Sequence, residues 1–112
     1  MRIAIPTVED KLSMHFGHCQ AFALIDVDEE GKKIIGRETT PAPPHQPGLL
    51  PKWLKARGVD MVIAAGMGQR AQSLFAHEGI SLMVGAPSDT PDAVVASFLN
   101  GTLETGVNAC DH

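Results

Sequence analysis

Two cysteines, each with a histidine nearby, are the residues of this sequence best suited to chemistry. His15, His18 and Cys19 fall within five residues, and Cys110 stands two residues before His112. Imidazole nitrogen and thiolate sulfur are the ligands that zinc, copper and iron–sulfur centres prefer. This pairing of cysteine with histidine predicts a metal site. The alternative interpretation is that the histidines are exposed or structural and that Cys19 is a small buried hydrophobe.

Two other stretches are weaker candidates for the same site. His45 lies in the proline-rich stretch 41–48, where a solvated loop histidine is the more common case. Gly66, Met67 and Gly68 follow an apolar run and precede a helical pattern, so they predict a tight strand-to-helix turn. The amide groups of such a turn, with the helix dipole behind them, favour an anion or an anionic cluster.

Chain length, net charge, apolar runs and cysteine content limit the class of protein. With 112 residues, the chain is predicted to be one domain, 1–112. The formal net charge of −4 and the lack of a basic run argue against nucleic-acid binding. No apolar stretch approaches the roughly 20 residues that span a bilayer, and no signal peptide is recognised, so we expect a cytoplasmic protein with no membrane contact. In that compartment two cysteines favour metal or redox chemistry over a disulfide.

Hydrophobic patterns predict an α/β fold. Apolar or alternating runs indicate strands over 2–6, 21–28, 33–40, 61–65 and 80–84, with Pro6 ending the first and a loop over 7–19. Helical spacing indicates helices between 50 and 58, between 68 and 79 and between 88 and 101. Residues 102–112 form a tail without a period. The expected order is βββαβαβα, in a five-stranded mixed sheet with helices packed on it.

The candidate residues should converge at one edge of this sheet. If the hairpin 21–40 lies on one side of the first strand and the later strands lie on the other, the loop 7–19, the loop with His45 and the turn 66–68 all leave the same edge. Open α/β sheets bind ligands at such a topological switch point. The eleven-residue tail extends to at most ~36 Å, so Cys110 and His112 can fold back to this edge.

Three stretches resemble the dinitrogenase iron–molybdenum cofactor biosynthesis family, small cofactor carriers of nitrogenase assembly and their relatives. They are Met1–Pro6, then Ser13–Cys19 followed by Phe22, and Gly66–Gly68 with the helix up to Gly79. The resemblance implies a ribonuclease-H-like three-layer fold and a carrier or scaffold for a metal–sulfur cluster, not an enzyme. It implies iron, with molybdenum or copper, as the metal, and cluster-donating or cluster-accepting proteins as partners. His18, Cys19 and the ending 110–112 match only a subset of relatives, so the resemblance leaves the metal open.

Other functions stay open at this point. A structural zinc site formed by the same ligands would leave function to protein partners, and the turn 66–68 alone would suit an anion or a small molecule. Enzyme interpretations are weaker: residues 2–5 lack the carboxylate of a nuclease, and no Gly-x-Ser-x-Gly elbow occurs. A nucleophilic Cys19 or a redox pair of Cys19 with Cys110 remain minor alternatives. The sequence permits either a monomer or a homodimer.

Overall fold

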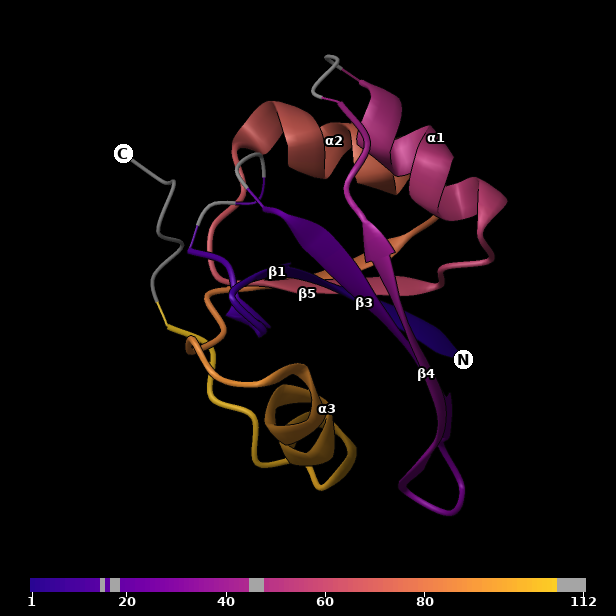
Figure 1. Ribbon diagram of the computed structural model, residues 1–112, viewed down its shortest axis with the longest axis vertical. Coiled ribbons are helices and arrows are strands. Elements are labelled where there is room, and N and C mark those ends of the chain that lie inside the picture. Colours follow the sequence, from indigo (N-terminus) through magenta and orange to yellow (C-terminus); the bar gives the residue numbers. More distant parts are fainter. Residues whose placement is uncertain (15, 17–18, 45–47, 107–112) are drawn as a thin grey trace.

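The computed structural model describes residues 1–14, 16, 19–44 and 48–106. Within these ranges the chain forms one mixed sheet with helices on both faces (Figure 1), which confirms the predicted α/β class. The strands are β1 (Arg2–Val8), β2 (Lys11–Leu12), β3 (Ala21–Asp28), β4 (Lys33–Pro41), β5 (Met61–Ala64) and β6 (Ser81–Val84). The helices are α1 (Leu49–Ala56), α2 (Gln69–His77) and α3 (Pro91–Leu99).

The strand order is β4-β3-β1-β5-β6, with β2 paired to β1 outside this path. The hairpin of β3 and β4 pairs antiparallel with β1 on one side, whereas β5 and then β6 continue in parallel on the other. This confirms the predicted placement of the hairpin and of the two later strands around β1. The carboxyl ends of β1, β4, β5 and β6 therefore share one edge of the sheet, as the convergence argument requires.

The start of the loop 7–19 was predicted wrongly. The first strand does not end at Pro6 but continues to Val8, and the described sheet has six strands, not five, because Lys11–Leu12 pairs back onto Thr7–Val8. A turn at Glu9 and Asp10, both with positive φ, joins the two strands. Pro6 is tolerated within the strand because its carbonyl points away from β3 and accepts from Ser13 N. The nitrogen of a strand residue points to the same side as its carbonyl, so the missing N–H of Pro6 removes no hydrogen bond between β1 and β3.

The sheet separates two apolar layers. Alternate residues of β1 point to opposite faces: Ile3 and Ile5 join a cluster with Val94 and Val95 of α3. Between them, Ala4 faces the other cluster, which α1 and α2 cover with Leu54, Phe75 and their neighbours. Figure 1 shows α1 and α2 on one side of the sheet and α3 on the other. The predicted helices thus form the outer layers of a three-layer domain.

The helices are short and rely on packing and capping. The predicted cap of α3 is confirmed: Thr90 Oγ1 accepts from Ala93 N at 3.3 Å, and Pro91 occupies the first turn. Asp92 in that turn also pairs with Arg37 Nη1 at 2.8 Å, which ties α3 to β4. None of the helices in the described ranges is long and apolar enough to cross a membrane.

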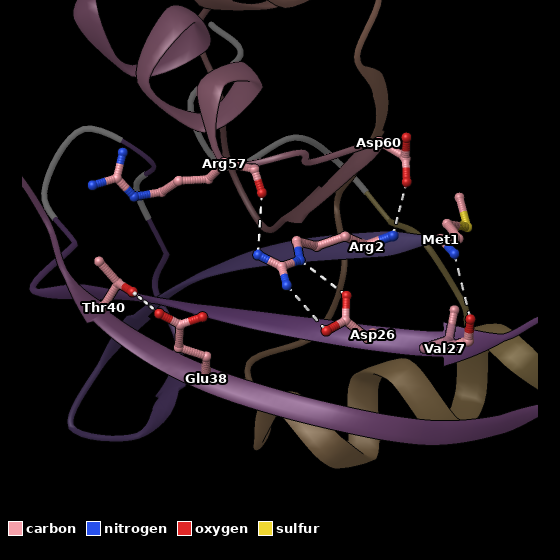
Figure 2. Close-up of polar contacts among 8 residues, drawn as sticks. All are labelled: Met1, Arg2, Asp26, Val27, Glu38, Thr40, Arg57 and Asp60. Atoms are coloured by element: carbon pink, nitrogen blue, oxygen red, sulfur yellow. Dashed lines mark hydrogen bonds and ion pairs between the residues drawn. The ribbon is translucent and has the colours of Figure 1, made fainter.

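Arg2 closes the opposite edge of the sheet, where β1 begins (Figure 2). Its guanidinium donates to both carboxylate oxygens of Asp26 on β3, at 2.9 and 3.2 Å, and to the Arg57 carbonyl just after α1 at 3.1 Å. Its backbone N donates to Asp60 Oδ2 at 2.8 Å, just before β5. The hydrogen bond to Asp26 raises the pKa of Arg2 further, against the opposing effect of burial. This cation therefore joins three segments at the edge away from the predicted site.

Candidate functional site

The segment between β2 and β3, residues 13–20, is attached to the sheet at both ends. Ser13 N donates to the Pro6 carbonyl at 2.8 Å, and Gln20 N donates to the Thr7 carbonyl at 2.8 Å. Both acceptors lie near the end of β1, so the segment leaves the sheet and returns to it over two adjacent residues. The two ends of the segment, Ser13 and Gln20, are therefore held next to each other at the end of β1.

Phe16 attaches the middle of this segment to the core. Its backbone N donates to the Gly66 carbonyl at 3.0 Å, and its ring is only 5% exposed. The ring packs edge-to-face on Phe75 of α2, with centroids 5.3 Å apart, and tilted on Phe22 of β3 at 5.8 Å. The segment 13–20 is thereby joined to β3, to α2 and to the turn after β5. His15 and His18, which flank Phe16 in sequence, lie outside the described residues.

Cys19 is the one predicted metal ligand within the described ranges. Its side chain is half-buried and packs against the same apolar cluster as Phe16 and Phe22. Burial raises the pKa of the thiol to about 11, while a backbone hydrogen bond lowers it slightly. The thiol is therefore protonated near neutral pH, and a metal that binds it must displace the proton.

The exit from β4 lies beside Cys19. Ala42 N donates to the carbonyl of Gln20 at 3.0 Å, so the chain that leaves β4 runs next to the residue that follows Cys19. This bond confirms that the loop between β2 and β3 and the loop that follows β4 lie at the same edge of the sheet. His45, three residues after Ala42, lies outside the described residues, so its part in the site stays a prediction.

The glycine turn between β5 and α2 completes this edge. Gly68 is the residue before α2, with an extended backbone, and open space surrounds the position that a Cβ would take there. Gly66 and Met67 are buried, so Gly68 is the exposed residue of this turn. The Met67 carbonyl accepts from Gln72 Nε2 at 2.8 Å, which closes the first turn of the helix.

The tail returns to the same edge over the residues that the structure describes. Leu103 packs on the core beside α3, and Gly106 N donates to the Gly85 carbonyl at 2.7 Å, directly after β6. In Figure 1 this yellow segment runs from α3 to the turn that follows β6. Gly85 has φ +92°, and a Cβ there would overlap the Gly106 backbone. Sequence reasoning missed this contact, although a glycine directly after a parallel strand, as at Gly66, was a usable signal.

The described residues do not form a metal site alone. Across 1–14, 16, 19–44 and 48–106, no three His, Cys, Asp or Glu side chains are grouped to hold a metal ion. Five of the six predicted ligands lie outside these ranges: His15, His18, His45, Cys110 and His112. The structure places the exit from β4 beside the loop 13–20 through the Ala42–Gln20 hydrogen bond, and it holds the tail up to Gly106 at Gly85, after β6 at the other end of the strand order.

Comparisons with known proteins agree with this arrangement. A family model described as "Dinitrogenase iron-molybdenum cofactor" matches residues 1–101. An uncharacterized protein of Methanocaldococcus jannaschii is 32% identical over 108 residues, which cover 93% of this chain and 90% of that protein. The crystal structure of PH0822 is 30% identical, with 97% of each chain covered and a TM-score of 0.88. The apo form of the orange protein from Desulfovibrio gigas is 19% identical, with coverage of 96% and 93% and a TM-score of 0.72, and shares the fold.

Proposed function

This chain belongs to the dinitrogenase iron–molybdenum cofactor family, and we propose that it is a non-catalytic carrier or scaffold for a metal–sulfur cluster. One observation carries the proposal: the segment 13–20 is bound to the sheet at both ends and through Phe16, with half-buried Cys19 inside it. A carrier needs ligands held at a fixed edge while the bound metal stays accessible to a second protein. The cargo would be an iron cluster, with molybdenum or copper, exchanged with donor and acceptor proteins.

The proposed ligands come from three segments of one edge. Cys19, His15 and His18 would bind from the segment 13–20, Cys110 and His112 from the tail, and His45 from the loop after β4. Thiolate and imidazole suit soft and borderline metals, which is the donor set that such a cluster needs. Backbone amides of the turn Gly66–Gly68, at the start of α2, would favour a negatively charged cluster.

The test is elemental analysis with a visible absorption spectrum, on protein purified without oxygen or chelators. Iron, molybdenum or copper with sulfide-to-metal bands is expected. The double variant Cys19→Ser/Cys110→Ser should lose the metal and the colour. His77→Ala is the matched histidine control, because His77 is an exposed residue at the end of α2. Full metal content in the double variant would refute thiolate ligation.

A structural zinc site is the second candidate. The hydrogen bond that holds the tail at Gly85 favours it. A zinc ion held by Cys19 and Cys110 would tie the end of the chain to the sheet, and function would then lie in protein partners. Because the binding energy of structural zinc is folding energy, chelation would lower the unfolding temperature strongly. Removal of a carried cluster would leave the domain folded. Elemental analysis also separates the two candidates, because a structural site would give one zinc per chain and no visible colour.

A further inference from the structure

A hollow of about 450 Å³ lies between the β1–β2 hairpin and the turn before α3. Val8, Leu12 and Met14 supply its apolar wall, and Glu9 and Lys11 supply charges of both signs. The Met14 side chain is 52% exposed, a large apolar surface for a position beside the predicted metal loop. An apolar side chain that covers this wall would remove apolar surface from water, which is favourable.

The walls of the hollow are held by hydrogen bonds between distant parts of the chain. Leu12 N donates to the Asp89 carbonyl at 2.9 Å, and Ser88 Oγ donates to the Leu12 carbonyl at 3.1 Å. These bonds join β2 to the segment between β6 and α3. The hollow therefore exists before anything occupies it, which lowers the entropy that docking would cost.

The tail reaches the neighbourhood of this hollow. Gly106 donates a hydrogen bond to Gly85. Gly85 is three residues before Ser88, which lines the hollow, so Gly85 and Ser88 are at most ~10 Å apart. The six residues that follow Gly106 extend to at most ~20 Å. Gly85 permits the approach because it has no Cβ to overlap Gly106. The tail is thus held at a point from which residues 107–112 can enter the hollow.

We propose that residues 107–112 dock in this hollow as an internal ligand and bring Cys110 to the loop 13–20. Val107 would cover the apolar wall at Met14, and Asp111 would turn towards Lys11 and away from Glu9. The docking itself needs no metal. Its consequence, a cysteine from the tail delivered to the ligands of the loop, rests on the proposed function.

Disulfide trapping on the metal-free full chain tests the docking. In a Cys19→Ala background, Met14→Cys introduces a thiol on the wall of the hollow, and Cys110 is the other thiol in the chain. Oxidised glutathione takes two electrons and two protons from the two thiols, which form a disulfide, and becomes two molecules of reduced glutathione. The equilibrium ratio of disulfide to free thiols at known glutathione concentrations gives the effective concentration of one protein thiol at the other. The matched control is Gln69→Cys, because Gln69 is exposed and begins α2 at the same edge of the sheet but on its other face. The Met14→Cys variant should exceed this control at least about tenfold, because an undocked tail gives only the millimolar values of a flexible tether.

Variants of the tail anchor complete the test. In the Met14→Cys background, Gly85→Ala should lower the effective concentration several-fold, because the new Cβ displaces Gly106. Gly58→Ala is its control: Gly58 also has positive φ, +78°, but open space around its Cβ position. If Gly85→Ala does not fold, Gly106→Pro removes the donated hydrogen bond instead and should lower the value likewise.

Each outcome decides the matter. Equal values for Met14→Cys and Gln69→Cys, or no effect of the anchor variants, would overturn the docking. A high value that the anchor variants abolish supports it, whatever the metal content of the wild-type protein. If the Met14→Cys variant is trapped as expected but the wild-type chain, with Cys19 and Cys110 free, binds no metal, the carrier function would be refuted and the docking would stand.

Discussion

The chemistry of Cys19 follows from its half-buried position. Burial keeps the thiol protonated near pH 7 by raising its pKa to about 11. A metal can bind only by releasing that proton, so metal affinity should rise with pH. A thiol of this kind reacts slowly with oxidants and electrophiles while it keeps its proton, which suits a carrier that is periodically empty.

Alkylation kinetics test this pKa directly. At pH 8 roughly a thousandth of the Cys19 thiol is ionised at a pKa near 11, against roughly a tenth at 9.0. The greater nucleophilicity of a more basic thiolate recovers part of the difference. In a metal-free Cys110→Ser variant, iodoacetamide should therefore react at least about tenfold more slowly in the folded state than in urea. Equal rates in the two states would contradict the burial.

The same pKa affects stability at high pH. Because the folded value lies above the ordinary 9.0, this group contributes stability that is complete below pH 9 and is lost as the pH rises towards 11. The free energy of unfolding should fall across this window in the Cys110→Ser variant. It should fall less when Cys19 is also replaced by alanine, which serves as the control in urea titrations.

Phe16 is expected to support both stability and metal binding. Phe16→Ala removes a ring packed between Phe22 and Phe75 and should cost about 3 kcal/mol of unfolding free energy. Phe16→Leu keeps most of the apolar volume and should cost less than about 1.5 kcal/mol. Urea denaturation measures the cost. Where the alanine variant is still folded, metal titration should find weaker binding, and unchanged affinity would mean that the loop is positioned without this ring.

At the scale of elements, α3 depends on a local device. Thr90 caps the helix, so Thr90→Ala should lower the free energy of unfolding by about 1 kcal/mol, while Thr90→Ser should change it by only a few tenths. Thermal unfolding of the three proteins measures both. A loss of the same size for serine would indicate that the methyl group of threonine, not its hydroxyl oxygen, supports the helix.

The elements differ in how far the sequence specifies them. The five longer strands and three helices follow from short-range periodicity, and Thr90 with Pro91 gives a start signal that needs no distant partner. By contrast, β2 has two residues and exists only because Lys11 and Leu12 meet Thr7 and Val8 across a turn with positive φ. Two residues are too few to show a period, which is why the stretch 7–19 was predicted as loop throughout.

At the scale of the molecule, the two edges of the sheet have separate tasks. Arg2 joins β1, β3 and the chain after α1 at one edge, whereas the segment 13–20 and the glycine turn occupy the other. Arg2→Met should therefore lower the unfolding free energy by about 1 kcal/mol, a modest value because the pair with Asp26 is 30% and 39% exposed. Metal affinity, measured by titration of the folded protein, should stay within about twofold of wild type.

Phe16→Ala is the comparison, since it should change both quantities. A marked loss of metal affinity in Arg2→Met would show that the two edges are coupled. Unchanged stability would show that the hydrogen bonds of Arg2 merely replace those to water.

The candidate site was predictable in its composition and in its edge. His15, His18 and Cys19 stood out by residue type, and the loops were predicted to leave the sheet together once the hairpin and the later strands were placed on opposite sides of the first strand. Ligation by these residues stays a prediction, because most of them lie outside the described ranges. The half-buried state of Cys19 was not predictable, since it depends on Phe22 and other residues of the core that β3 and α2 bring next to it.

By itself, the sequence determined the five longer strands, the three helices and their order, because periodicity and capping act between residues a few positions apart. Only the tertiary structure decided that Phe16 enters the core between Phe22 and Phe75, that Pro6 continues a strand, and that Gly85 receives Gly106. Each of these contacts joins segments whose distance in space is set by the pairing of strands far apart in the chain. No local pattern encodes that distance, because it results from the assembly of the whole sheet.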